Sequence, residues 1–266
     1  MKKKYDMIFS MGAACSCSQA LREAGLQFAS FPFDWVVGPG ICFRAQMIAD
    51  DFPGWLEPET FIRVETPKFS TSVWYRDKFG FSLIHDFHVG VPFDEELPLV
   101  RAKYRRRIDR LSRLLDSANR ALVVYIESGG AASASADDAV KVRETLARRW
   151  PCVDFDVLLV KYREGVPFSR RSDETGEGWR FVQYDFKDRR EDEWRVDWRQ
   201  VARWLRKEYE VVDYRTAEEK AQWKSRARKR EYAEFKATNW WGYAVTKIQY
   251  KIYKHLRKRL LRKGIV

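Results

Sequence analysis

The sequence predicts an α/β protein: a three-layer sandwich around a mostly parallel central sheet, followed by a helical C-terminal extension. Short apolar segments such as 121–126 have the length and composition of strands that are buried on both faces. Segments with helical periodicity lie between them along the chain. Strands that alternate with helices are typical of a parallel sheet covered by helices on both sides. Rossmann-like and flavodoxin-like sheets are of this kind, and they bind ligands at the carboxyl ends of their strands.

The first half of the chain begins with a buried strand, a tight turn and a helix. Residues 5–11 form the apolar strand, which Gly12 interrupts. A helix is predicted over 15–24, because small and apolar residues fall on one face and Gly25 provides a C-terminal stop. Beyond it we expect an aromatic loop at 28–35, a helix at 41–52, a hairpin with strands at 72–75 and 79–87, and an amphipathic helix at 95–118.

The second half continues this alternation of strands and helices. We expect strands at 121–126, 153–160 and 179–184, a short extended piece at 211–214, helices at 137–150 and 198–208, and loops at 127–136 and 163–178. Everything after about Thr216 has helical character. The sequence therefore predicts two parts, a catalytic-type α/β domain at residues 1–215 and a basic helical tail at 216–266.

Charge is distributed unevenly along the chain. The 266 residues have a net charge of +12, and residues 218–266 carry 15 Lys/Arg against 4 Asp/Glu. An argument from charge to an anionic partner therefore concerns the tail. No apolar run approaches the ~20 residues needed to span a bilayer. The four cysteines lack the spacing of a disulfide framework, which predicts a reducing, cytoplasmic location. A lipoprotein-type signal at the start is disfavoured because Asp6 interrupts it.

The segment from Ser10 to Cys17 is the first candidate for chemistry. Cys15 is predicted to begin a helix, where the positive end of the dipole favours the thiolate and makes the sulfur a nucleophile. Backbone amides in this segment could stabilise an oxyanion, so Gly12, Ala14 and Cys17 are candidate substrate-binding residues. The alternative is a small cysteine that packs beneath the helix.

Two of the three histidines lie in the segment His85-Asp86-Phe87-His88. A cysteine nucleophile needs a base, and histidine serves because its pKa lies near neutrality. In a strand His85 and Asp86 point to opposite faces, so the carboxylate that orients the histidine could come from elsewhere. The alternative is an exposed hairpin end. The spacings of Cys15, Cys17 and the two histidines are not those of usual zinc sites, and we predict neither a metal nor a cofactor.

Two loops are candidates for the walls of the site. The segment Phe31-Pro-Phe-Asp34-Trp35 places an acid between aromatic residues. Asp34 could orient a histidine and Trp35 could line a pocket, or the loop packs into the core with Asp34 capping backbone amides. The small residues after Glu127 and Ser128 would let a ligand approach the backbone closely, which makes these two residues candidates as well. The glycine patterns of nucleotide sites are absent from this loop.

The tail combines positive charge with a helical stripe of apolar residues. From residue 240 to 266 there are eight Lys/Arg and no acid. A basic amphipathic helix with interfacial aromatics suits an anionic membrane surface. The alternatives are a stripe that packs on its own domain or on a second copy, and nucleic acid, which we do not expect because no binding motif accompanies the charge. The candidate membrane-binding residues are Trp240, Trp241, Lys247, Lys251 and Arg257.

Taken together, three motifs resemble a bacterial family of unknown function labelled "putative papain-like cysteine peptidase". They are Ser10-Met-Gly-Ala-Ala-Cys15, Phe31-Pro-Phe-Asp34-Trp35 and His85-Asp86-Phe87. Met11 stands where the family pattern has leucine. The resemblance is specific over about residues 5–90 and does not extend to the tail. It implies an association with genes for surface polysaccharide synthesis.

Carried over to this sequence, the resemblance implies Cys15 as the nucleophile, His85 as the base, and Asp34 or Asp86 as the orienting carboxylate. The resulting hypothesis is a thiol hydrolase or acyltransferase acting on a surface-glycan or other acylated precursor, in polysaccharide or lipopolysaccharide biosynthesis at the inner membrane face. A nucleophile directly after the first strand is also similar to SGNH-hydrolase-like sandwiches. The alternative is a non-catalytic protein that associates with a membrane or a glycosyltransferase.

Overall fold

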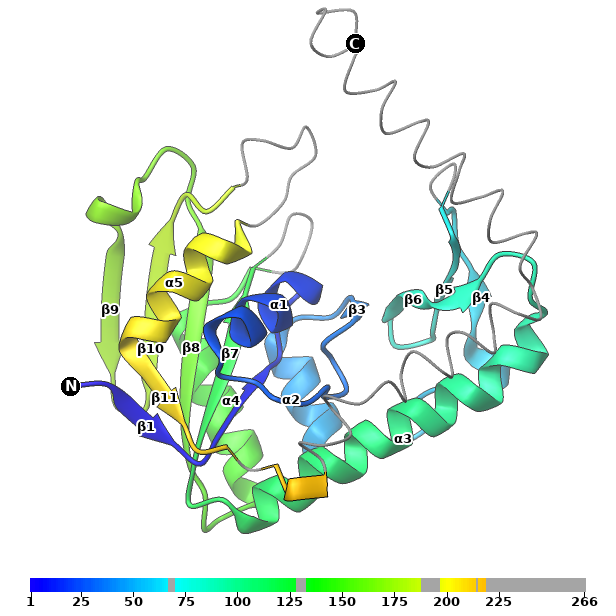
Figure 1. Cartoon of the computed structure of the whole chain (residues 1–266), viewed down its shortest axis with the longest axis horizontal. Helices are drawn as coiled ribbons and strands as arrows, with labels where there is room; N and C mark the ends of the chain where they lie inside the picture. Colours follow the sequence, from blue (N-terminus) through cyan, green and yellow to red (C-terminus); the bar gives the residue numbers. More distant parts are fainter. Residues whose placement is uncertain (67–69, 128–132, 188–196, 214, 219–266) are drawn as a thin grey trace, which may run out of the picture.

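A computed structural model shows a mixed α/β protein with a mostly parallel central sheet (Figure 1). It describes residues 1–66, 70–127, 133–187, 197–213 and 215–218. The strands are β1 (Lys3–Tyr5), β2 (Met7–Ser10), β3 (Val36–Val37), β4 (Ile62–Arg63), β5 (Ser72–Arg76), β6 (Ser82–His88), β7 (Arg120–Ile126), β8 (Asp154–Tyr162), β9 (Ser172–Gly176), β10 (Trp179–Tyr184) and β11 (Tyr209–Val211). The helices are α1 (Cys15–Ala24), α2 (Ile41–Ala49), α3 (Phe93–Ser117), α4 (Ala136–Arg149) and α5 (Trp198–Glu208), with short 3₁₀ turns η1 (Pro58–Thr60) and η2 (Phe168–Arg170).

The central sheet has the strand order β2-β7-β8-β10-β9. Its first four strands run parallel to their neighbours, and β9 at the edge runs antiparallel to β10. A separate parallel pair joins β1 to β11. Because parallel strands share one direction, the carboxyl ends of β2 and β7 lie side by side. The loops that follow these two strands therefore meet at one edge of the sheet.

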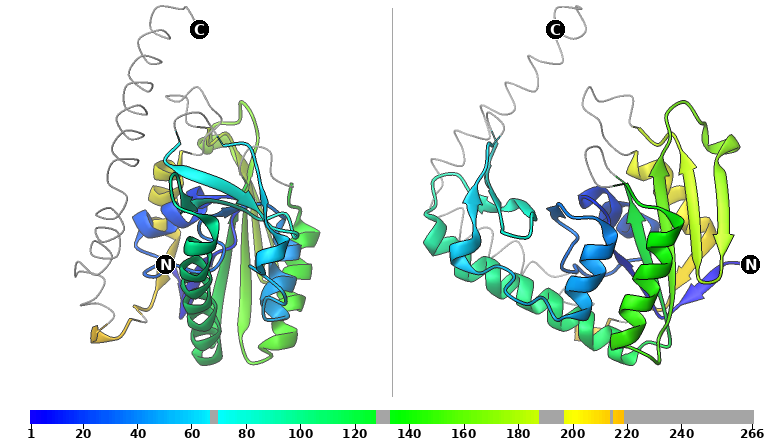
Figure 2. Two further views of the ribbon diagram at one scale, coloured as in Figure 1. Left: turned by 90° about the vertical axis from the view of Figure 1, so that its right-hand side faces the viewer. Right: turned by 180° about the vertical axis from the view of Figure 1, so that it is seen from behind.

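Helices cover both faces of this sheet. Along β7, Leu122, Val124 and Ile126 pack with residues of α1 and α5, whereas Val123 and Tyr125 pack with residues of α2, α3 and α4. Figure 2 shows the same arrangement, with α1 and α5 on one side of the sheet and α2 and α4 on the other.

The chain between β2 and β7 also forms a smaller antiparallel sheet with the order β3-β6-β5-β4. In Figure 1 its strands β4, β5 and β6 lie beside the N-terminal part of α3, away from the central sheet. Aromatic rings join the small sheet to α3. The ring centroid of Phe93 in α3 lies 4.6 Å from that of Tyr75 and 5.1 Å from that of Phe87. The small sheet is therefore held by α3 through side-chain packing.

A buried carboxylate strengthens this attachment. Asp86 of β6 accepts hydrogen bonds from the ammonium of Lys103 and from the hydroxyl of Tyr104, the latter at 2.8 Å. Burial alone would raise the pKa of Asp86, but the positive charges of Lys103 and Arg107 and the two hydrogen bonds hold it below its ordinary range. Asp86 therefore remains ionised and connects β6 to two consecutive residues of α3.

Most of the predicted elements are confirmed, with shifts at their ends. The predicted helices at 15–24 and 198–208 and the strand at 179–184 have the bounds that the structure shows. The predicted strand at 5–11 is divided at Asp6 into β1 and β2. The helix expected to reach residue 52 ends at Ala49, because Asp51 and Phe52 adopt positive φ angles of 59° and 57°.

One predicted loop is wrong, and three strands were not predicted: β9, β3 and β4. Residues 163–178 are not a continuous loop, since they contain η2 and the edge strand β9. An edge strand that is mostly exposed carries charged side chains and so lacks the apolar alternation that reveals a strand. The two-residue strands β3 and β4 are too short to give a pattern. The tail predicted at 216–266 lies almost entirely outside the described residues.

Replacement of Asp86 by Asn should lower the free energy of unfolding at pH 7 by about 2 kcal/mol, because Lys103 loses its buried counter-charge. The folded-state pKa of Asp86 is depressed, so its stabilisation is present above the unfolded pKa of ~3.9 and is lost as pH falls below it. Urea unfolding between pH 3 and 7 measures both effects. Asp109→Asn removes an exposed partner of Arg105 and serves as the control, and an equal loss in the two variants would contradict the prediction.

Candidate active site

The loop between β2 and α1 continues to follow β7 after the strand ends. The amide of Met11 donates to the carbonyl of Val124 at 2.9 Å, and that of Ala13 donates to Ile126 at 3.3 Å. These bonds hold the loop against the last residues of β7. As a result, Cys15 begins its helix at the carboxyl edge of the sheet, the position that the alternating pattern predicted for a site.

Gly12 makes the tight approach of loop and helix possible. A Cβ at this position would collide with the Cβ of Cys17 and would lie 2.8 Å from its Sγ. The amide of Gly12 also donates to the hydroxyl of Ser10 at 3.2 Å. Only a residue without a side chain fits here, and the reason is close packing against the first turn of α1.

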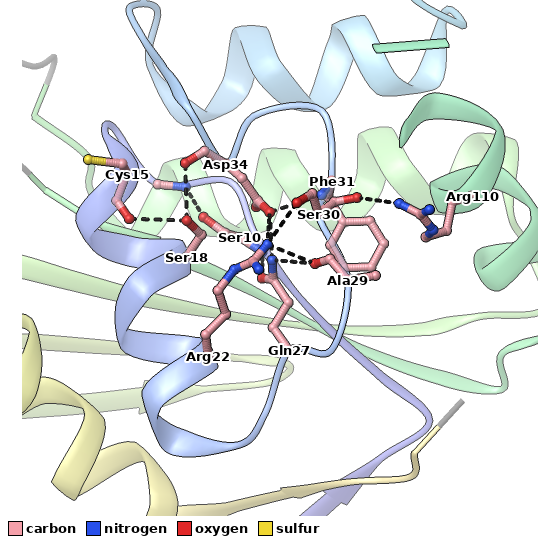
Figure 3. Close-up of polar contacts among 11 residues, drawn as sticks. Ser10, Cys15, Ser18, Arg22, Gln27, Ala29, Ser30, Phe31, Asp34 and Arg110 are labelled. Atoms are coloured by element: carbon pink, nitrogen blue, oxygen red, sulfur yellow. Dashed lines mark hydrogen bonds and ion pairs between the residues drawn. The ribbon is translucent and has the colours of Figure 1, made fainter. Parts of the chain in front are cut away.

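Cys15 is the first residue of α1 and is half-buried. Its N-cap, Ala14, has no side chain that can accept a hydrogen bond from the first-turn amides, and that turn contains no acidic residue. The positive end of the helix dipole therefore remains available to an anion. In Figure 3 the sulfur of Cys15 points away from the polar cluster formed by the neighbouring loop.

Cys17 has a different environment from Cys15, although only one residue separates them. It is fully buried, and its thiol donates to the carbonyl of Val124 at 3.3 Å. Burial raises the pKa of the Cys17 thiol to about 12. Cys17 is therefore a neutral thiol at pH 7 that packs between α1 and β7. Its contribution to substrate binding stays a prediction.

Asp34 is the centre of the polar cluster in Figure 3. Its Oδ2 accepts hydrogen bonds from Arg22 at 3.1 Å, from the side-chain amide of Gln27 at 2.7 Å and from the backbone amide of Phe31 at 2.9 Å. Burial raises the pKa of Asp34, and the positive charge of Arg22 opposes this effect. The hydroxyl of Ser18 donates to the carbonyl oxygen of Asp34 at 3.0 Å. The cluster thus fixes the aromatic loop on α1.

Trp35 connects this loop to His85. The two rings meet edge to face with centroids 6.0 Å apart, and the guanidinium of Arg22 lies 5.5 Å from the centroid of the Trp35 ring. His85 is exposed, yet loss of part of its solvent shell lowers its pKa below 6.5, while the charge of Asp86 opposes the shift. His85 is therefore neutral at pH 7 and able to accept a proton.

Neither of the two motif aspartates forms a hydrogen bond with this histidine among the residues that the structure describes. Within the described part of the chain His85 makes no hydrogen bond, and the bonds of Asp34 and Asp86 lead to α1 and α3 respectively. As expected for neighbouring residues of a strand, His85 is exposed while Asp86 is buried. The proposed role of either carboxylate in orienting His85 stays a prediction.

The loop after β7 contributes one described candidate. Glu127 is half-buried and its Oε2 accepts a hydrogen bond from the amide of Tyr162 at 2.9 Å, which joins the ends of β7 and β8. Ser128 lies outside the described residues, as do the candidate membrane-binding residues Trp240, Trp241, Lys247, Lys251 and Arg257. In the ranges that the structure describes, no helix is long and apolar enough to cross a membrane.

Sequence reasoning missed several buried polar side chains. Glu96 of α3 accepts hydrogen bonds from both the backbone amide and the ring of His88, each at 2.6 Å, so the second histidine is held by a carboxylate. Arg44 of α2 is completely buried. Glu96 lies in an amphipathic helix, where sequence predicts a polar residue on the exposed face, whereas Arg44 is one of two polar residues in an otherwise apolar helix. Among the described residues no group of three or more His, Cys, Asp or Glu could hold a metal ion.

Gly12→Ala should destabilise the protein by about 2–3 kcal/mol, because the added methyl group collides with Cys17 and forces the first turn of α1 away from the preceding loop. Gly90→Ala is the matched control. Gly90 has a φ of 87° but open space around its Cβ position, so its replacement costs only about 1–2 kcal/mol of backbone strain. Thermal and urea unfolding compare the two. A smaller loss for Gly12→Ala than for Gly90→Ala would contradict the packing argument.

Comparison with known proteins gives one match. No curated protein and no solved structure matches the chain. A family model described as "Putative papain-like cysteine peptidase (DUF1796)" matches residues 6–165. That range is more than half of the chain and contains Cys15, Asp34 and His85. The chain belongs to this family.

Proposed function

We propose that the protein is a cysteine-nucleophile enzyme of acyl transfer, a hydrolase or an acyltransferase. The observation that carries the proposal is the position of Cys15. It is a half-buried cysteine in an uncapped first turn at the carboxyl edge of a parallel sheet. Membership of a family described as cysteine peptidases supports the same chemistry. A nucleophile directly after an early strand is also the arrangement of SGNH-hydrolase-like sandwiches.

The proposed reaction has two steps. The Sγ of Cys15 attacks a carbonyl carbon, and amides of the first turn of α1 stabilise the oxyanion. Collapse of this intermediate forms a thioester and releases the leaving group, which takes the proton that His85 removed from the thiol. Water or an acceptor hydroxyl then attacks the thioester, loses its proton to His85 and regenerates the thiol.

The environment of His85 supports its role as the base. Its lowered pKa makes it neutral at pH 7, so it can take a proton from Cys15. The aromatic loop links α1, which carries Cys15, to β6, which carries His85. Ser18 of α1 donates a hydrogen bond to the backbone of Asp34, and the adjacent Trp35 ring contacts His85. Catalytic contacts are often loose without substrate, which is consistent with a His85 ring that makes no hydrogen bond within the described residues.

The first test is the pH dependence of Cys15 alkylation by iodoacetamide, read by mass spectrometry. We expect an apparent pKa for Cys15 well below ~8.5, the value of a free thiol, and a higher one in His85→Ala. Cys152 is exposed and provides a reference thiol in the same sample. Cys17 should stay unmodified up to pH 9, because its pKa is about 12 and it is buried.

His88→Ala is the matched control for this experiment, because His88 is bound to Glu96 rather than to Trp35. It should leave the pKa of Cys15 unchanged. If Cys15 and Cys152 show the same apparent pKa for alkylation in the wild-type protein, a nucleophilic role for Cys15 is contradicted. A second candidate function would then apply, a non-catalytic binding protein. Asp34 and Asp86 form hydrogen bonds that join elements of the fold, and in the described residues neither bonds to His85, which favours this alternative.

We further propose that the substrate is a surface-glycan precursor or another acylated small molecule, and that the tail docks the enzyme on the inner membrane face. Support for docking comes from sequence: eight Lys/Arg and no acid between residues 240 and 266, with aromatic residues at intervals. Lipid-linked precursors are found at such a surface, which would bring substrate and enzyme together.

Conversion of Lys247, Lys251 and Arg257 to Gln should weaken binding to vesicles with anionic lipid by about 100-fold. Each basic residue near such a surface contributes about 1 kcal/mol. Co-sedimentation of the full chain with vesicles of phosphatidylglycerol and phosphatidylcholine measures the effect.

A control with an equal loss of charge converts to Gln three exposed residues of the α/β domain, Arg105, Arg106 and Lys141. It should retain binding to these vesicles. Equal loss in both triple variants would show that net charge, rather than the tail, determines attachment.

A further inference from the structure

Arg44 is a buried cation whose hydrogen-bonding capacity is mostly unused. Its side chain is 0% exposed, and its Nε donates to the carbonyl of Pro39 at 2.7 Å. Nη1 and Nη2 have no hydrogen-bond partner among the described residues. The guanidinium carbon lies 5.1 Å and 5.3 Å from the ring centroids of Phe33 and Phe81. The bond to Pro39 fixes the guanidinium and leaves its two terminal nitrogens unpaired.

The groups that interact with Arg44 do not neutralise it. The titratable groups that would favour its charged form, if they were anions, are Tyr125 and Cys17. Burial raises the pKa of each to about 12, so the phenol and the thiol are both uncharged at pH 7. No ion pair with a carboxylate forms at Arg44 in the part of the chain that is described. The positive charge is therefore unbalanced.

These neighbours also locate the charge relative to the candidate active site. Cys17 belongs to the first turn of α1, two residues after Cys15, and Tyr125 is the penultimate residue of β7. Both lie where the carboxyl ends of β2 and β7 meet the start of α1. The guanidinium of Arg44 is therefore near the same edge of the sheet, and its helix α2 belongs to the layer opposite to α1.

A buried arginine without a counter-charge lowers the stability of the folded state. Burial of an ion without a partner costs several kcal/mol, and contact with the aromatic rings returns only about 2 kcal/mol. The fork of a guanidinium matches the paired oxygens of a carboxylate or phosphoryl group. The combination of an uncapped helix N-terminus and an unpaired buried guanidinium therefore suits an oxyanion.

We propose that Arg44 is the anion-binding residue of this site, and that the molecule bound there carries a carboxylate or phosphoryl group that accepts hydrogen bonds from Nη1 and Nη2. This inference rests on the proposed function, since it places the anionic group of the substrate next to Cys15. Because Arg44 is 0% exposed, an anion reaches the guanidinium only through a local opening of the protein, so binding is saturable but slower than diffusion.

The test uses acetate and inorganic phosphate as separate probes, with chloride at matched ionic strength as the reference. The melting temperature of the full chain should rise saturably with one of the probes, and calorimetry should show one site. A stronger response to acetate indicates a carboxylate, and a stronger response to phosphate indicates a phosphoryl group. Arg44→Met should abolish the response while leaving the ligand-free protein as stable as the wild type or more so.

Arg106→Met removes an exposed arginine and should preserve anion binding. If Arg44→Met does not fold, Arg44→Lys keeps the charge but loses the fork, and it should bind the probe at least tenfold more weakly. An absence of saturable binding in the wild type, or equal binding in the Arg44 variants, would overturn the proposal. Cys15→Ala should still bind the anion, so failure of the nucleophile and failure of the anion site are distinguishable.

Discussion

The buried carboxylate of Asp34 connects the segments on which the candidate site depends. Through one oxygen it accepts hydrogen bonds from α1, from Gln27 and from the backbone of its own loop. Gln27 in turn accepts a hydrogen bond from the amide of Ser10 at the end of β2. Strand, helix and aromatic loop are thus fixed to a single charge. The positions of both Cys15 and Trp35 follow from this network, since one begins the helix and the other ends the loop.

Two kinds of buried charge are found in the described part of the chain, paired and unpaired. Asp86 has two donors on α3, and Asp34 has Arg22 close by, so each serves to join elements. Arg44 has aromatic rings and neutral groups around its terminal nitrogens. Paired charges add specificity to packing, whereas an unpaired one lowers stability unless something else balances it. This contrast separates the residues that hold the fold from the residue that we assign to a ligand.

Much of the site could be predicted from sequence because its parts are local. A strand, a glycine and a helix that starts with cysteine are consecutive, and the structure places Cys15 at the first position of α1. The opposite orientations of His85 and Asp86 follow from strand geometry alone. The partners of Asp34 and Asp86 could not be predicted from the sequence. Arg22 and Lys103 are two among 50 basic residues, and no pattern in the sequence assigns either of them to a particular aspartate.

The sequence by itself determined the class of fold, the parallel core and the chemical character of the segment around Cys15, since hydrophobic periodicity and turn residues act over short distances. Only the tertiary structure decided which polar residues are buried. Glu96 lies in a helix with an exposed polar face, yet it is buried where it binds His88 of β6. Arg44 is buried against the aromatic rings of Phe33 and Phe81, which are distant from it in the sequence. Burial depends on contacts between distant segments, so it appears only when the layers are assembled.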